Sequence, residues 1–166
     1  MTSPTPSTTT SQTRAHHRMA RLSTWHWAGM AVLAVAAALP ASAQEAPYQD
    51  VHRLLKAGQL PEAAQKAESW LAQKPRDPQM RFLKSVIQSE QGDNEAAQET
   101  LTALIQDYPE LPEPYNNLAV LQAAAQRYAP AREALEMAVK LNPSYALAYQ
   151  NLGDVYVQLA GQAYRQ

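Results

Sequence analysis

Apolar residues recur at helical spacing through the chain from about residue 46 onward. In the segment 128–141, Ala131, Leu135, Ala138 and Val139 stand three or four residues apart, so that one face of a helix collects them. No part of this region alternates between apolar and polar residues as a strand does. We therefore predict an all-α fold.

The helical segments repeat with a period of 34 residues. Three prolines and three alanines keep this interval: Pro75, Pro109 and Pro143, and Ala63, Ala97 and Ala131. The period divides the chain into units 44–77, 78–111 and 112–145 and a partial unit 146–166. The first helix of each unit is expected at about 46–57, 78–91, 112–125 and 146–159, and the second at about 60–73, 94–107 and 128–141. Gly58 and Gly92 fall between paired helices, where a left-handed residue ends a helix at little cost.

The later units carry a recognisable signature. In the partial unit, Tyr149, Leu152, Gly153 and Tyr156 occupy places 4, 7, 8 and 11. The third unit matches at places 4, 7, 8, 20, 24, 27 and 32 with Tyr115, Leu118, Ala119, Ala131, Leu135, Ala138 and Pro143, but has Gln122 at place 11. This pattern resembles the tetratricopeptide repeat, a pair of antiparallel helices that must stack on its neighbours. The resemblance implies an α-solenoid of about three and a half hairpins over residues 44–166.

The first two units depart from this signature. Arg81 and Lys84 stand at places where the family prefers apolar residues, and Trp70 stands where a small residue is usual. Terminal units of solenoids are often atypical, so we interpret the first as a degenerate capping repeat. Trp70 either fills the gap towards the first helix of the second unit or is exposed as a contact. Packing is the favoured alternative, because large rings rarely stay exposed without a partner.

Residues 1–43 have the composition of a leader. A Ser, Thr and Pro-rich stretch over 1–13, expected to be disordered, precedes three arginines (Arg14, Arg18 and Arg21) and an apolar run from about Ala28 to Leu39. The run is shorter than the roughly 20 residues that span a bilayer, and the small residues Ala41-Ser42-Ala43 follow it. We expect a signal peptide cleaved after Ala43. An uncleaved anchor is the alternative, and the start codon is either Met1 or Met19.

Removal of the leader changes the net charge. All three arginines of the leader leave, whereas all 15 acidic residues remain with 11 basic ones, which gives a formal charge of −4. This balance disfavours nucleic acid as a partner. The chain has no cysteine, so it has no disulfide and no thiolate metal site. We expect an exported protein, periplasmic in a Gram-negative bacterium, with no membrane span after cleavage.

Catalytic and metal-binding chemistry has little support. His52 is the one histidine downstream of the leader, and no second ligand or base stands at a useful spacing. The serines lie in no nucleophile motif. We expect no enzyme activity, no cofactor and no metal site.

The resemblance implies a concave groove lined by the first helix of each unit. Its places 5 and 6 hold four carboxamides: Asn116, Asn117, Gln150 and Asn151. A carboxamide both donates and accepts hydrogen bonds, so such a row is suited to the backbone of an extended peptide. Asparagine at place 6 is also common in the family without a known ligand, and that reading stays open.

Neighbouring groove places favour a mixed ligand. Phe82, Val86 and Val120 add apolar surface, and Asp154 adds a carboxylate. The family's clamp for chaperone C-termini needs Lys and Arg at places 2, 5 and 6, which this chain lacks. An apolar or mixed extended segment is the expected ligand.

The sequence thus predicts a non-catalytic adaptor of the cell envelope, similar to small exported tetratricopeptide proteins of Gram-negative bacteria. A self-assembling structural protein is the first alternative, because the partial unit offers an apolar face without a second helix. An enzyme is the second, and it would require catalytic residues that residues 44–166 do not reveal.

Overall fold

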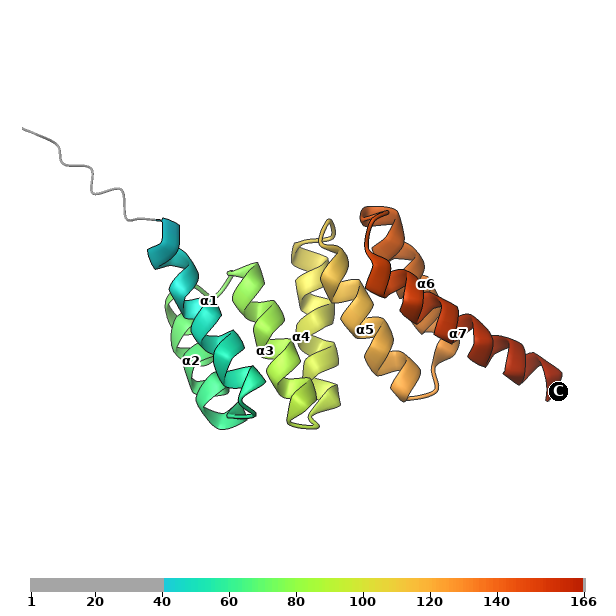
Figure 1. The fold of residues 1–166 in the computed structure, drawn as a ribbon, viewed down its shortest axis with the longest axis horizontal. Helices are drawn as coiled ribbons and strands as arrows, with labels where there is room; N and C mark the ends of the chain where they lie inside the picture. Colours follow the sequence, from blue (N-terminus) through green and yellow to red (C-terminus); the bar gives the residue numbers. More distant parts are fainter. Residues whose placement is uncertain (1–40, 166) are drawn as a thin grey trace, which may run out of the picture. The chain divides into compact units, whose positions relative to one another are not determined.

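The computed structural model describes residues 41–165, and within this range all the regular secondary structure is helical. The helices are α1 (Ala41–Lys56), α2 (Leu60–Gln73), α3 (Pro78–Glu90), α4 (Asn94–Asp107), α5 (Pro112–Ala124), α6 (Tyr128–Leu141) and α7 (Ala146–Tyr164). Figure 1 shows them following one another as antiparallel pairs. The predicted all-α fold is confirmed. The predicted leader, up to residue 40, lies outside the described residues.

Two helix ends differ from the prediction. α1 begins at Ala41 rather than near residue 46, because the residues that precede Pro47 are mostly good helix formers. The predicted cleavage point after Ala43 therefore lies in the first turn of α1. α7 continues to Tyr164 rather than ending near residue 159. Ala160 stands where earlier units have their turn residue, and alanine favours continuation of the helix.

The turns between paired helices repeat one backbone conformation. Gly58 and Gly92 have φ of 69° and 82°, as the sequence predicts, and Gln126 adopts the same left-handed conformation with φ of 58°. All three stand at place 15 of their units. A side chain at such an angle is strained, so the third unit closes its turn less favourably than the first two.

The buried residues show why the repeat keeps small side chains. Ala63, Ala97 and Ala131 are each 0% exposed, at the contacts between paired helices. Small residues at these places let the two backbones approach closely. The buried apolar residues form three clusters: Val51, Leu54, Ala63, Ala67, Met80, Leu83 and Ile87; Ala97, Leu101 and Leu121; and Ala119, Ala131, Leu135, Ala138, Ala148, Leu152 and Val155.

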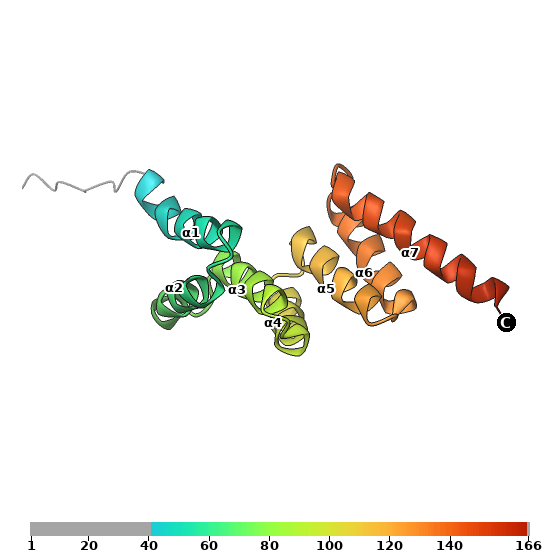
Figure 2. The ribbon, with the colours of Figure 1, turned by 60° about the horizontal axis from the view of Figure 1, so that its bottom comes forward.

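The helices stack in chain order. Each helix packs on the next one, and in addition α1 contacts α3 and α5 contacts α7. Figure 2 shows the same succession from another side. Each buried cluster joins neighbouring helices, as expected for a solenoid whose units are stabilised by their neighbours. Between residues 41 and 165, no helix is both long enough and apolar enough to span a membrane.

Asp77 ties the first unit to the second. It is the N-cap of α3, and its Oδ1 accepts a hydrogen bond of 2.9 Å from the Met80 amide. Its Oδ2 accepts from the Tyr48 hydroxyl at 2.6 Å and from Trp70 Nε1 at 3.0 Å. The Trp70 ring also meets Tyr48 edge-on and lies beneath Lys74. Trp70 therefore packs at the junction of the two units, which is the favoured of its two predicted roles.

These contacts shift two pKa values. Burial, the hydrogen bond to Asp77 and the charge of that carboxylate raise the pKa of Tyr48 to about 12. Burial opposes ionisation of Asp77, but the hydrogen bonds from Tyr48, Met80 and Trp70 outweigh it, so its pKa lies below the ordinary value.

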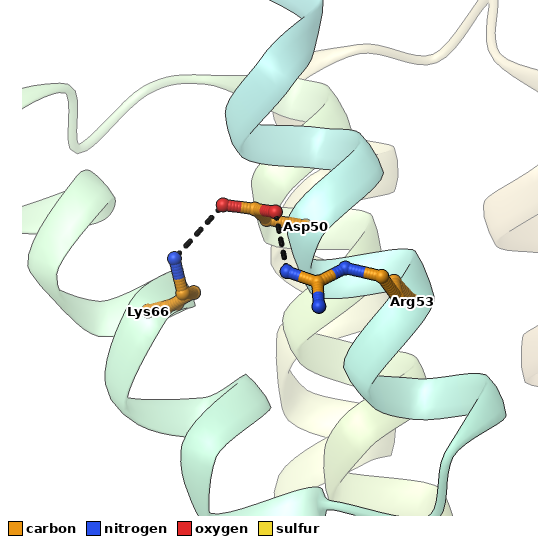
Figure 3. Close-up of polar contacts among 3 residues, drawn as sticks. All are labelled: Asp50, Arg53 and Lys66. Atoms are coloured by element: carbon orange, nitrogen blue, oxygen red, sulfur yellow. Dashed lines mark hydrogen bonds and ion pairs between the residues drawn. The ribbon is translucent and has the colours of Figure 1, made fainter.

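On the surface, α1 and α2 are joined by an ion-pair cluster around Asp50. Lys66 of α2 and Arg53 of α1 donate to its two oxygens at 2.9 and 2.8 Å, as Figure 3 shows. The hydrogen bond from Lys66, followed by that from Arg53, lowers the pKa of Asp50. All three side chains are well exposed, so the cluster contributes little to stability.

Candidate functional site

Three pockets lie along the first helices of the second, third and fourth units. We name them after one lining residue each. The Phe82 pocket is lined by His52, Pro78, Gln79, Phe82, Leu83, Leu111, Glu113 and Pro114. The Asn117 pocket is lined by Ser85, Val86, Ser89, Glu90, Leu101, Asn117, Val120 and Leu121. The Asp154 pocket is lined by Ala119, Val120, Ala123, Tyr128, Leu135, Asn151, Asp154, Val155 and Gln158.

The pockets adjoin one another. Val120 lines both the Asn117 pocket and the Asp154 pocket, and one turn of α3 separates Phe82 from Val86. We call the three together the groove. α3, α5 and α7 supply most of its lining, as the repeat register predicts for the first helix of each unit.

Six of the eight predicted groove residues line these pockets. They are Phe82, Val86, Asn117, Val120, Asn151 and Asp154. Gln150 is exposed but lines none of the three. Asn116 is 2% exposed, so its expected contact with a ligand needs correction. It stands one residue before a groove position, and the turn of α5 directs it inward to the core.

The three asparagines form a chain of hydrogen bonds. Asn151 Nδ2 donates to Asn116 Oδ1 at 2.8 Å, and Asn116 Nδ2 donates to Asn117 Oδ1 at 3.2 Å. The buried amide of Asn116 is thus bonded on both sides, as a buried polar group requires. It positions its two neighbours rather than binding a ligand itself.

This chain leaves complementary groups facing the groove. Because the Asn117 oxygen accepts from Asn116, its Nδ2 group is left to donate into the Asn117 pocket. Because the Asn151 amide donates to Asn116, its Oδ1 is left to accept in the Asp154 pocket. A donor and an acceptor on neighbouring helices match the carbonyl and the amide of a peptide backbone.

Sequence reasoning missed several residues of the lining. Tyr128 and Leu135 of α6 form part of the Asp154 pocket, reaching it from the second helix of the hairpin. Glu90 and Glu113 line the other two pockets. Glu90 stands at place 13 and Glu113 at place 2 of their units. The register assigns both places to the groove, so the sequence could have predicted these two residues. The contribution of α6 could not be predicted from the sequence, because it depends on how α5, α6 and α7 pack together.

Residues 41–165 contain no assembled metal centre. There, no group of three or more His, Cys, Asp or Glu side chains is placed to hold a metal ion. His52 is exposed at the Phe82 pocket, where the other polar neighbours are Gln79 and Glu113. The arrangement offers apolar walls, amides and carboxylates, which suit binding of a polypeptide.

Comparisons of sequence identify the repeat. Two family models described as tetratricopeptide repeat match residues 54–119 and 112–145, which together span more than half of the chain. A search of curated proteins found none that matches.

Solved structures share the fold. The structure of Naa15/Naa10 bound to HypK-THB matches with a TM-score of 0.64 and 21% identity, over 72% of this chain but only 18% of that one. The first TPR of Spaghetti (RPAP3) bound to HSP90 peptide SRMEEVD matches with a TM-score of 0.64 and 16% identity, over 69% of this chain and 91% of that one. The Yersinia enterocolitica type III secretion chaperone SycD, in complex with a peptide of the translocator YopD, matches with a TM-score of 0.62 and 13% identity, over 75% of this chain and 96% of that one. At these identities the likeness concerns the fold.

Proposed function

Because the chain belongs to the tetratricopeptide repeat family, we propose that it is a non-catalytic adaptor whose groove holds an extended segment of another protein. Two structures with the same fold, those of RPAP3 and SycD, contain a bound peptide. The observation that carries the proposal is the hydrogen-bond chain through Asn151, Asn116 and Asn117. It fixes two amides in the groove before any ligand arrives, which reduces the entropy lost on binding.

The proposal includes a location. The leader composition of residues 1–43 supports export, and we propose that residues 44–166 work in the envelope of a Gram-negative bacterium. The partner is then a protein of that compartment.

The test is a comparison of groove variants. The partner is first identified by crosslinking in the producing cells, and its affinity for the purified protein is measured by calorimetry. Asn117→Ala combined with Val120→Ala should weaken binding roughly tenfold, because both side chains line the Asn117 pocket. Gln150→Ala is the matched control, since that amide lies outside the pockets, and it should bind as the parent does. Equal affinity for all three proteins would refute a role for the groove.

One observation favours a second candidate, self-association through α7. The outer face of this helix exposes Tyr149, Tyr156 and Tyr164 at 50%, 47% and 92%, and a Cβ added to Gly153 would meet nothing within 4 Å. If this face pairs with another copy, the sedimentation coefficient should rise with protein concentration. Tyr149→Lys together with Tyr156→Lys should then remove the rise.

A further inference from the structure

Each pocket of the groove contains one carboxylate. Glu113 lines the Phe82 pocket, Glu90 the Asn117 pocket and Asp154 the Asp154 pocket. Within the described part of the chain none of the three makes an ion pair or a hydrogen bond. Burial raises the pKa of Tyr145, and the negative charge of Glu113 raises it further. The groove therefore carries three uncompensated negative charges.

Some acidic residues away from the groove have basic partners. Asp50 is paired with Lys66 and Arg53, as described above, and Asp107 accepts from Arg81 at 2.6 Å. The groove carboxylates thus lack the basic partners that Asp50 and Asp107 have. Among the described residues this is also true of several exposed acids outside the groove, including Glu62, Glu68 and Glu110.

Basic residues also avoid the groove. No lysine or arginine lines any of its three pockets, and His52 is the one basic group there, at the edge of the Phe82 pocket. Arg81 and Lys84 line a separate hollow beside Leu71 and Pro75, and Arg127 lines another on α4. These two hollows also contain Glu95 and Glu99, so acidic side chains occur outside the groove as well, whereas the groove pockets contain carboxylates and no lysine or arginine.

The rest of the lining is mostly apolar or amide, with hydroxyls from Ser85, Ser89 and Tyr128. Phe82, Val86, Val120 and Val155 give surfaces for apolar side chains, while Asn117 and Asn151 offer the backbone donor and acceptor described above. An acidic segment bound there would meet three like charges, which costs affinity, and a basic one would gain from each.

We propose that the occupant of the groove is an extended segment that carries lysine or arginine side chains among apolar ones. This inference rests on the proposed function and narrows its partner to one charge class. The basic side chains lie beside Glu90, Glu113 and Asp154, and the apolar ones fill the spaces next to Phe82, Val86 and Val120. Salt weakens this contribution, because the groove is open to solvent.

The test uses three labelled peptides of equal length, each of three triplets: Lys-Gly-Leu, Gln-Gly-Leu and Glu-Gly-Leu. Fluorescence anisotropy with the full mature protein at low salt should rank them basic, neutral, acidic, with roughly a tenfold step from neutral to basic. The variant Glu90→Gln, Glu113→Gln, Asp154→Asn should remove this preference. The control variant Glu62→Gln, Glu68→Gln, Glu110→Gln changes the net charge equally at exposed positions outside the groove, and it should keep the preference.

The possible failures are distinguishable. Equal binding of the three peptides, or a preference that survives in the groove variant, would overturn the charge inference and leave the groove as a peptide site. Loss of the preference in the control variant would show that net charge alone selects the peptide, which also overturns it. No binding of any peptide would contradict both the inference and the general affinity of the groove for extended segments.

Discussion

Asn151 of α7 donates a hydrogen bond of 2.8 Å to the buried carboxamide of Asn116 in α5. The two residues belong to consecutive repeats, and the bond lies directly beneath the groove. Asn116 donates in turn to Asn117, so one buried amide orients a side chain on each of two groove helices. The same contact joins neighbouring hairpins and orients two side chains of the groove.

Asn116→Ala should lower the free energy of unfolding by about 2 kcal/mol, because it leaves a hole in the core and removes the partners of Asn117 and Asn151. Urea denaturation measures the change. The exposed Gln150→Ala should alter stability by less than about 0.5 kcal/mol. A similar small effect for both variants would mean that the amide chain does not support the repeat junction.

Gln126→Gly should raise the free energy of unfolding by about 1 kcal/mol, because Gln126 holds a left-handed φ of 58° that glycine adopts without strain. Gln126→Ala, which keeps a Cβ, should give no such gain. Thermal unfolding of the two variants beside the parent protein decides the matter. Destabilisation by glycine would contradict the strained turn.

Tyr48→Phe should reduce stability at neutral pH by about 1 kcal/mol, a value discounted for the partial exposure of the hydroxyl. The folded pKa of Tyr48, about 12, lies above its ordinary value of 10.0, so folding favours the protonated hydroxyl. That contribution is fully present below pH 10 and is lost as the pH rises through 12.

The alkaline part of the prediction is a comparison of pH profiles. The parent protein should lose more stability than Tyr48→Phe between pH 10 and 12, measured by urea denaturation. Tyr164→Phe serves as the control, since Tyr164 is 92% exposed, and its profile should follow the parent. Parallel profiles for all three proteins would show that the bond to Asp77 does not contribute.

Expression of the whole gene in a Gram-negative host should give a protein that begins at Gln44, because the small residues before it match a signal-peptidase site. Intact mass of the exported fraction measures this. Ala41→Arg together with Ala43→Arg should block processing and keep the protein on the membrane. A mature protein that still begins at Met1 or Met19 would contradict the export proposal.

The repeat made the fold predictable from the sequence. Prolines and alanines at a constant interval set the register, and the register alone placed Ala97 and Ala131 at helix contacts, where the structure buries both completely. The predicted end of the last helix, near residue 159, was wrong because the repeat pattern is broken there. Ala160 replaces a turn residue and lets α7 continue, which depends on local propensity and not on the period.

The site was predictable at the level of places and less so for single side chains. The register assigns Asn117, Val120 and Asn151 to the groove, and all three line its pockets. The register also assigned Asn116 to the groove, but the structure buries it. Successive side chains on a helix point in directions roughly 100° apart, so Asn116 faces the core while the next residue, Asn117, faces the groove. Which amides bond to each other is decided by packing between repeats, and a linear pattern does not contain that information.

The most direct test of the groove as a protein-binding site is site-specific photo-crosslinking in living cells. A benzophenone side chain would replace Val120, which is 46% exposed in the groove, and in a second strain Glu133, which is exposed on α6. The account predicts a covalent adduct with one predominant polypeptide from position 120 and none from position 133. Absence of an adduct at position 120, or the same adducts from both positions, would contradict it.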